Sequence, residues 1–310
     1  MSVTKIVIPA AGLGSRFLPY TKAIPKEMLP VLNKPLIQYS IEEGLSSEIN
    51  NFILITDKDK NAIANHIDAD HPHASTLTER NAHSLLASAE RIGRLGNYTY
   101  IRQREPLGLG HAVWLANHCI APKEYFGIML PDELIDSKEP ALKQLIRIAY
   151  QEKASVIAVQ EVPQNMVSHH DIIAIKKTIT PSLFQVSHIL EKPHLKDAPS
   201  HLAVVGRYVV SGKIFSALDY VSSSLECEEI QLNKAISALM QNNERVFAYK
   251  IQGTHYTIDT PLSWLGANIG YGLKNPEYAA YIRKMVNGEP AETNHSPLFN
   301  PAKAMMEQGL

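Results

Sequence analysis

A glycine-rich turn follows the first apolar run of the chain. Residues 5–9, KIVIP, lead directly into AAGLGSR at 10–16. Glycines at the end of a strand let backbone N–H groups approach a phosphate chain that side chains would obstruct. Arg16 adds a planar donor fork for phosphate oxygens, and Lys26 adds a compact point charge ten residues later. The turn predicts a phosphate-binding loop, although a Gly-x-Gly pair alone is equally compatible with a structural turn.

Two other phosphate-binding signatures do not fit this loop. The dinucleotide fingerprint needs a third glycine, and Phe17 stands in its place. The Walker loop ends in Gly-Lys followed by Ser or Thr, which is missing here. A dinucleotide-dependent oxidoreductase is therefore only a distant alternative.

A carboxylate follows another strand-like run. FGIM at 126–129 leads through Leu130 and Pro131 to Asp132 and Glu133. Ligands of parallel sheets collect at the carboxyl ends of the strands. Magnesium commonly takes one or two carboxylates together with phosphates and water. Asp132 is therefore the candidate Mg²⁺ ligand, while Glu133 is equally readable as an acid at the start of a helix.

The elements that must position these residues alternate along the first half of the chain. Strand-like runs lie at 5–9, 51–56, 98–103, 126–130 and 155–162. Helical patterns lie between them, at 41–47, 59–67, 110–120 and 141–153. This alternation predicts an α/β, Rossmann-like fold with a mostly parallel central sheet and helices on both faces.

The rhythm changes after residue 165. Three strand-like runs, at 171–178, 183–193 and 201–210, follow with only turns between them. They predict an antiparallel β insertion beside the parallel sheet in the C-terminal half. Helical patterns then return at 213–223, 229–243, 262–273 and 276–286, with one strand at 245–251. Residues 288–310 are proline-containing and aperiodic, which is typical of a loosely held tail.

Composition narrows the class of protein. With 310 residues, 45% hydrophobic, the chain is long enough to bury a large core. Its formal charge of -1 provides no global field for nucleic acid or an anionic membrane, so neither partner is expected. Cys119 and Cys227 are isolated, which favours a reducing compartment. The first apolar run is too short for a signal or a membrane span. We therefore expect a soluble cytoplasmic protein.

Seven blocks of the chain resemble the bacterial UTP:glucose-1-phosphate uridylyltransferases, also called UDP-glucose pyrophosphorylases. The blocks are AAGLGSRFLP at 10–19, TKAIPKEMLPVLNKPLIQYSIEE at 21–43, IRQREPLGLGHAV at 101–113, LPDE at 130–133, EKP at 191–193, SHLAVVGRYV at 200–209 and EIQLNKAI at 229–236. They stand in the family's order across residues 3 to 275. The resemblance implies one nucleotidyltransferase domain at 1–275, with a nucleotide-binding half at about 1–165 and a sugar-binding half at about 166–275. A C-terminal helix and tail occupy 276–310.

The resemblance also assigns nucleotide-binding roles. It implies that the nucleotide is lined by Ala10, Ala11, Gly12 and Gly14, with Gly14 and Arg16 over the triphosphate. Gln103 is implied as the uracil reader, because an amide offers a donor and an acceptor to the imide edge of the base. Gly108 leaves room for backbone to approach the base and ribose. Glu27 either supports the base pocket or pairs with a neighbouring lysine.

On the acceptor side, Glu191 and Lys192 match the family's Glu-Lys-Pro. The glutamate there accepts hydrogen bonds from sugar hydroxyls, and the lysine meets the sugar phosphate. Without that context, the pair before a proline would indicate only a turn. The resemblance implies Mg²⁺, UTP and a sugar 1-phosphate as ligands, with Arg16, Lys26 and Lys192 as the catalytic cations. We also expect a homo-oligomer.

The chain departs from the family pattern in its acceptor half. His170 and Asp171 stand where the family has Tyr-Gly, which makes Asp171 a candidate sugar-phosphate-site residue and leaves the choice of sugar open. In the block at 228–234, Glu-Glu-Ile-Gln-Leu-Asn-Lys replaces Gly-Glu-Ile-Gln-Leu-Thr-Asp. HYTID at 255–259 replaces Arg-Tyr-Asp-x-Gly and so removes the second metal aspartate. Glu133 stands where a second aspartate is usual.

Asp259 is a candidate to replace that missing metal ligand. If residues 255–259 form a strand, Thr257 and Asp259 share a face about 6.7 Å apart. Equally, Asp259, Thr260 and Pro261 form a helix-capping sequence.

Three hypotheses about function remain. The first is an active uridylyltransferase for glucose 1-phosphate, and the second is the same chemistry with another sugar 1-phosphate. The third is a non-catalytic paralogue that regulates, against which the retention of Arg16, Lys26 and Asp132 weighs.

Overall fold

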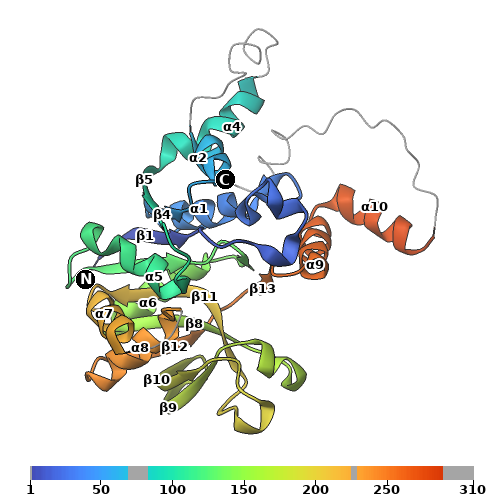
Figure 1. Ribbon diagram of the computed structural model, residues 1–310. Coiled ribbons are helices and arrows are strands. Elements are labelled where there is room, and N and C mark those ends of the chain that lie inside the picture. The colour runs from blue at the N-terminus through green and yellow to red at the C-terminus, as the bar shows by residue number, and fades with distance from the viewer. Residues whose placement is uncertain (1, 69–82, 225–228, 289–310) are drawn as a thin grey trace.

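The computed structural model describes residues 2–68, 83–224 and 229–288. The expectations for Cys227 and for most of the tail therefore lie outside the described residues. Figure 1 shows a sheet that runs through the molecule from β5 in the upper part to β9 at the bottom. Within the described ranges, no helix is long and apolar enough to cross a membrane.

The central sheet has nine strands in the order β5-β4-β1-β6-β11-β8-β12-β10-β9. Their bounds are β5 Asn97–Arg102, β4 Asn51–Thr56, β1 Val3–Pro9, β6 Tyr125–Met129, β11 Leu202–Ser211, β8 Ser155–Glu161, β12 Val246–Lys250, β10 Leu183–Leu190 and β9 Ile172–Thr180. Only β11 and β10 run against the direction of the others. The expected α/β fold is confirmed, and its sheet is mixed, because β11 and β10 pair antiparallel with all their neighbours.

Helices cover both faces of the sheet, as expected. One hydrophobic cluster joins the sheet to α1 Leu36–Ser46, α2 Asn61–Ile67, α4 His83–Leu95 and α6 Ala141–Glu152. The other cluster joins it to α5 Gly108–Trp114, α7 Ile214–Ser224 and α8 Leu232–Gln241. In β1, Ile6 and Ile8 belong to the first cluster and Val7 to the second. Burial on both faces explains why these strands are continuous apolar runs.

The antiparallel insertion is integrated more deeply than the sequence suggested. Instead of lying beside the parallel strands, β11 sits in the middle of the sheet between β6 and β8. Its residues are buried along almost the whole strand. A strand this apolar needs cover on both faces, which only a central position provides. Helix α4 was also absent from the sequence-based prediction.

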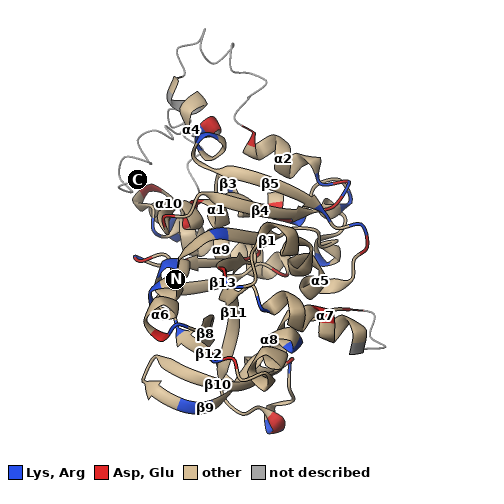
Figure 2. Cartoon of the chain, turned by 90° about the vertical axis from the view of Figure 1, so that its left-hand side faces the viewer, with Lys and Arg blue, Asp and Glu red and all other residues tan. Residues whose placement is uncertain are grey.

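Smaller elements close the site side of the sheet. Strand β7 Glu133–Asp136 pairs antiparallel with β13 Thr254–Thr257, and β2 Pro30–Val31 pairs with β3 Lys34–Pro35. Helices α9 Pro261–Gly272 and α10 Pro276–Val286 follow. In Figure 1 they extend away from the sheet on the right. Figure 2 shows basic and acidic residues interspersed along the described chain.

Candidate active site

A cavity of about 470 Å³ lies at the carboxyl ends of β1 and β6 and brings together residues from distant parts of the chain. Its lining includes ten of the residues singled out in the sequence, namely Ala11, Gly12, Gly14, Arg16, Lys26, Glu27, Gln103, Gly108, Asp132 and Asp259. This is the edge where ligands of parallel sheets bind.

The remaining candidates lie elsewhere. Ala10 is fully buried, and its backbone N–H donates to the Ile55 carbonyl at 2.7 Å. Glu191 and Lys192 are exposed just after β10, and Asp171 precedes β9. Because Ile172 pairs with Leu190, Asp171 lies across from Glu191 at this edge of the sheet. The acceptor-side candidates thus form a second group, outside the cavity lining.

Gly14 has a backbone conformation that favours glycine. Its φ is +64°, in the left-handed region. A Cβ here would lie 3.0 Å from both the Lys26 Cβ and the Thr21 Cγ2. The Thr21 hydroxyl donates to the Gly14 carbonyl at 2.8 Å. The loop is thereby packed directly against the segment that carries Lys26.

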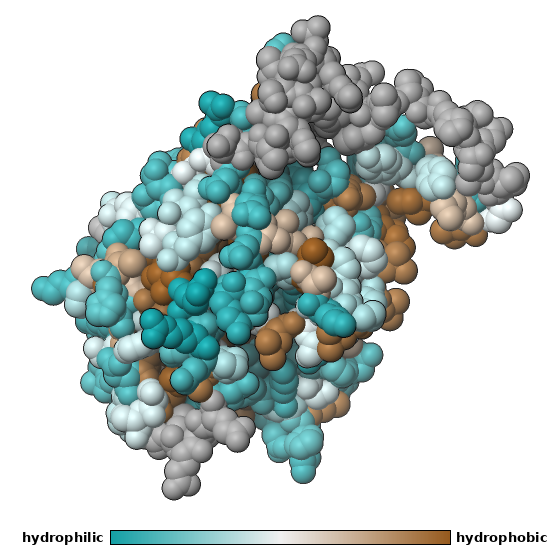
Figure 3. Space-filling model, turned by 45° about the horizontal axis from the view of Figure 1, so that its top comes forward, coloured by the Kyte–Doolittle hydropathy of each residue, from teal (hydrophilic) through white to brown (hydrophobic). Residues whose placement is uncertain are grey.

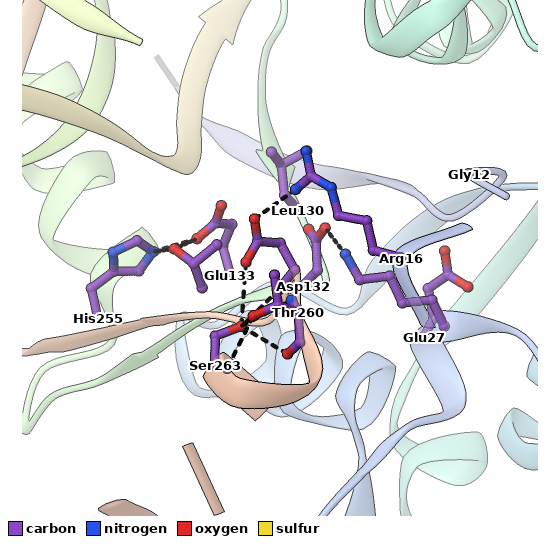
Figure 4. A network of polar contacts seen from close by, with 12 residues as sticks. Gly12, Arg16, Glu27, Leu130, Asp132, Glu133, His255, Thr260 and Ser263 are labelled. Atoms are coloured by element: carbon purple, nitrogen blue, oxygen red, sulfur yellow. Dashed lines mark hydrogen bonds and ion pairs between the residues drawn. The ribbon is translucent and has the colours of Figure 1, made fainter. Parts of the chain in front are cut away.

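Two ion pairs line the cavity. The Lys26 Nζ lies 2.7 Å from the Asp132 Oδ2, and the Arg16 guanidinium lies 2.6 Å from the Asp259 Oδ2. Figure 4 shows Arg16 and Asp132 close together in this network. Each cation that a phosphate chain would need is therefore paired with a carboxylate that a divalent cation would need. If a phosphate chain and a divalent cation bound together, the two basic side chains would pair with phosphate and the two carboxylates with the cation. No charge would then be left uncompensated.

Asp259 is positioned by a helix cap. Strand β13 ends at Thr257, so Asp259 lies beyond the strand. The next residue, Thr260, is already the N-cap of α9. The Thr260 side chain accepts from the Ser263 N–H, and Ser263 in turn bonds the Thr260 backbone N–H. The capping prediction is confirmed for Thr260 and Pro261. Asp259 itself directs Oδ2 to Arg16, while Oδ1 accepts from the Ser263 hydroxyl at 3.3 Å.

Glu27 pairs with a lysine that sequence reasoning missed. The Lys60 Nζ lies 2.8 Å from both Glu27 oxygens and donates to the Gly12 carbonyl at 2.6 Å. Burial raises the pKa of Glu27, and the Lys60 charge opposes that shift. Lys60 therefore joins the glycine loop to the segment at 25–28. Its separation of 33 residues from Glu27 gives no local signal in the sequence.

Gln103 is held in one orientation. Its Nε2 donates to the Gly108 carbonyl at 3.3 Å and is 3.0 Å from the His111 Nδ1. Burial lowers the pKa of His111, with the nearby Glu105 opposing, so the ring is neutral at pH 7 and its Nδ1 accepts. Both amide hydrogens are then used. Gln103 lines the cavity, and its Oε1 is the amide atom that these two contacts do not use.

Three residues that depart from the family pattern contact one another. Glu133 begins β7 rather than a helix, and Thr257 faces it across the β7–β13 pair. The Thr257 hydroxyl donates to the Glu133 Oε2 at 2.9 Å, and the same oxygen makes a short contact with the His255 ring. Glu133 and His255 are both visible in Figure 4 beside Asp132. Thr257 stands where the family resemblance implies a metal-binding aspartate, and its hydroxyl donates to Glu133.

The donor set of the cavity fits magnesium. Asp132 and Asp259 supply carboxylate oxygens, which hard divalent cations prefer. Among the described residues, no group of three or more His, Cys, Asp or Glu side chains could hold a metal ion alone. Phosphate oxygens would therefore have to complete the coordination, as is common for Mg²⁺.

The fold and this cavity define a nucleotide-binding transferase, and comparison with known proteins agrees. Residues 5–265 match the family model described as nucleotidyl transferase. The chain belongs to that family.

Within the family, the chain is similar to one kind of enzyme over nearly its whole length. It is 40% identical to the UTP–glucose-1-phosphate uridylyltransferase of Bacillus subtilis (strain 168), covering 92% of this chain and 97% of that one. A UTP-bound UGPase from Acinetobacter baumannii has a TM-score of 0.84 at 33% identity, covering 92% and 99%. A UDP-glucose pyrophosphorylase complexed with UDP-glucose has a TM-score of 0.79 at 31% identity, covering 88% and 100%. The resemblance seen in the sequence is confirmed.

Proposed function

We propose that this protein transfers a uridylyl group from UTP to glucose 1-phosphate and releases pyrophosphate. The observation that carries the proposal is the pairing of Arg16 and Lys26 with two carboxylates beneath the glycine loop of one cavity. These are the groups that phosphoryl transfer needs for positioning and charge neutralisation. The names of the similar proteins support UTP and glucose 1-phosphate as the substrates.

The base preference follows from the fixed Gln103 amide. The Gln103 Oε1, which neither of these contacts uses, is an acceptor and suits the N3–H of uracil. Cytosine presents an unprotonated N3 at that position, so an acceptor there would face another acceptor. His111 and the Gly108 carbonyl hold both amide hydrogens and prevent the amide from turning to suit cytosine. We therefore propose that UTP is preferred over CTP as well as over the purine triphosphates.

The chemical step needs no covalent intermediate on the protein. The phosphate of the acceptor is already anionic at neutral pH, so it can attack the α-phosphorus of UTP in line without a strong base. Arg16 and Lys26 would neutralise triphosphate oxygens, with Gly12 and Gly14 leaving space for backbone donors. Lys192 would hold the attacking phosphate and Glu191 the sugar hydroxyls. The P–O bond to pyrophosphate breaks as the new one forms.

We propose Mg²⁺ as the cofactor, held by Asp132 and Asp259. The bound cation would neutralise charge on the phosphates. Lys26 and Arg16, freed from these two carboxylates, would turn to phosphate oxygens. Thr257 keeps Glu133 in place and leaves the metal side to Asp259.

The wider setting is proposed on the same basis. We propose a cytoplasmic homo-oligomer in which residues 1–275 form the catalytic domain, about 1–165 bind the nucleotide and about 166–275 the sugar. Exposed apolar side chains on α9 and α10 support self-association, among them Leu262 at 78% and Val286 at 80% exposure. Figure 3 shows brown surface along the right-hand side, where Figure 1 places these helices.

Thr257 favours one competing function. Loss of the usual metal aspartate would suit a paralogue that binds nucleotide and regulates. Pyrophosphate release separates the two possibilities when measured with UTP, CTP, ATP and GTP against a panel of sugar 1-phosphates. The proposed enzyme releases pyrophosphate fastest with UTP and glucose 1-phosphate. Binding of UTP with no release from any pair would establish the regulatory function instead.

A further inference from the structure

Two departures from the family pattern meet in space. Asp171 and Asn233 are 62 residues apart, and the Asn233 Nδ2 donates to the Asp171 Oδ2 at 2.5 Å. The sequence places an aspartate where the family has glycine and an asparagine where it has threonine. Their direct contact shows that the two changes form one structural unit.

This pair leaves two buried oxygens without a hydrogen-bond donor. The Asp171 Oδ1 and the Asn233 Oδ1 are among the few buried side-chain atoms of the described residues that have no partner. Both are acceptors, so neither can satisfy the other. Buried polar atoms normally have partners, and each exception calls for an explanation. A group that donates hydrogen bonds at this point would complete the arrangement.

The pair lies between the acceptor-side residues and the nucleotide cavity. Asp171 faces Glu191 across the β9–β10 pair, since Ile172 pairs with Leu190. Burial is the main cause that raises the pKa of Asp171, and the Glu191 charge adds to it, whereas the Lys192 charge and hydrogen bonds from the Lys192 backbone and Asn233 oppose the shift. On the other side, the charges of Asp171 and Glu133 both raise the pKa of the buried Tyr208. Tyr208 therefore lies near both carboxylates.

Asn233 connects the pair to the nucleotide cavity. It stands in the first turn of α8, three residues after Ile230. The Ile230 N–H donates to the Leu107 carbonyl at 2.8 Å, and the Ile230 carbonyl accepts from the Gly110 N–H at 2.7 Å. Leu107 and Gly110 lie on either side of Gly108 and Leu109, which line the cavity. Asn233 therefore follows directly from a segment that is hydrogen-bonded to the wall of the nucleotide cavity.

We propose that Asp171 and Asn233 form a specificity-determining subsite that requires a hydrogen-bond donor on the sugar of the acceptor. This inference rests on the proposed function. The subsite would select a sugar 1-phosphate that carries a hydroxyl or an ammonium group at one particular ring position. A site built to bind such a group discriminates strongly against an analogue that lacks it, because its own buried polar atoms are then left unpaired.

The test compares acceptors that differ by one donor. Values of kcat/KM are measured for glucose 1-phosphate, its four monodeoxy analogues and an amino-sugar 1-phosphate. In the unmodified protein, one deoxy analogue should lose about 100-fold or more, and the others should lose much less. In Asp171→Gly that penalty should shrink to about tenfold or less, and Asn233→Thr should reduce it in the same direction. Preference for the amino sugar that disappears in Asp171→Gly would identify the donor as ammonium.

Matched controls keep the inference falsifiable. Asp197 is an exposed aspartate in a neighbouring turn, so Asp197→Gly should leave the deoxy profile unchanged. Thermal unfolding of each variant checks that the fold is intact. If Asp171→Gly does not fold, the deoxy profile of Asn233→Thr tests the inference in its place. A flat deoxy profile in the unmodified protein overturns the inference, as does a profile that stays unchanged from the unmodified protein in both Asp171→Gly and Asn233→Thr.

Failure of the proposed function is distinguishable from failure of this subsite. If no acceptor supports turnover, dissociation constants are measured for UDP-glucose and for its deoxy analogues. A selective loss of affinity for one analogue, abolished in Asp171→Gly, supports the subsite even without catalysis. Equal affinities for all of them overturn it.

Discussion

Replacing Lys60 with methionine should destabilise the protein by a pH-dependent amount. Lys60 and Glu27 have side-chain exposures of only 9% and 7%, and they form a buried ion pair. Methionine keeps most of the side-chain volume but removes the charge and the hydrogen bond to the Gly12 carbonyl. Glu27 is then left buried with its counter-ion removed, which is costly.

The magnitude can be worked from the carboxyl group that remains. Glu27 can avoid a buried charge by binding a proton, which costs about 1.4 kcal/mol per pH unit above its unfolded pKa of about 4.3. The cost at pH 7 is therefore about 4 kcal/mol, within the range measured for broken buried pairs. At pH 5 the same cost is about 1 kcal/mol. The lost hydrogen bond adds about 1 kcal/mol at either pH.

The sign of the pH dependence is fixed by proton binding. In the variant, the folded-state pKa of Glu27 lies above its unfolded value, so the folded state binds more protons. Stability should therefore rise as the pH falls from 7 to 5, and it should be lost as the pH rises. Urea denaturation at several pH values measures the free energy of unfolding. We expect a deficit of about 5 kcal/mol at pH 7 and about 2 kcal/mol at pH 5.

Two further variants test this reasoning. The double variant Lys60→Met with Glu27→Leu removes both charges and should recover most of the lost stability. Lys143→Met breaks the exposed pair with Glu48 and should leave the free energy of unfolding nearly unchanged. A deficit in Lys60→Met that does not vary with pH, or that persists in the double variant, would refute the buried-charge argument.

The other predictions concern the cavity. Lys26→Ala should lower kcat by about 100-fold in a pyrophosphate-release assay, because it removes a preorganised charge; circular dichroism should show an unchanged fold. Asp132→Asn should raise the Mg²⁺ concentration needed for half-maximal rate, since an amide lacks the negative oxygen that the cation prefers. Asp259→Asn should raise it as well, whereas Thr257→Asp should be tolerated or improve turnover; an unchanged Mg²⁺ titration in Asp259→Asn would remove that residue from the metal site. Because burial lowers the pKa of His111, the ring should gain a proton only below about pH 6.5, and the Gln103 amide would then lose its acceptor. Calorimetry should show weaker UTP binding below that pH, and His111→Asn should lack this step.

Local features of the sequence were sufficient for the class of fold and for the glycine turn that borders the cavity. The apolar runs that became β1, β4 and β6 are continuous because both faces of each strand are buried. Gly14 adopts a positive φ that its residue type permits, and Asp132 lies three residues after the end of β6. Each of these features depends on neighbours within a few residues, so periodicity and residue type could predict them.

Contacts between distant residues were decided only by the tertiary structure. The sequence determined that Glu27 needs a partner, but only the fold selected Lys60 from the lysines of the chain. In the same way, Asp171 and Asn233 appeared as separate departures, and the packing of α8 against β10 joined them. The central place of β11 also follows from burial on both faces rather than from strand propensity. The physical reason is common to all three: local propensity acts between sequence neighbours, whereas burial and charge pairing depend on which surfaces the folded chain brings together.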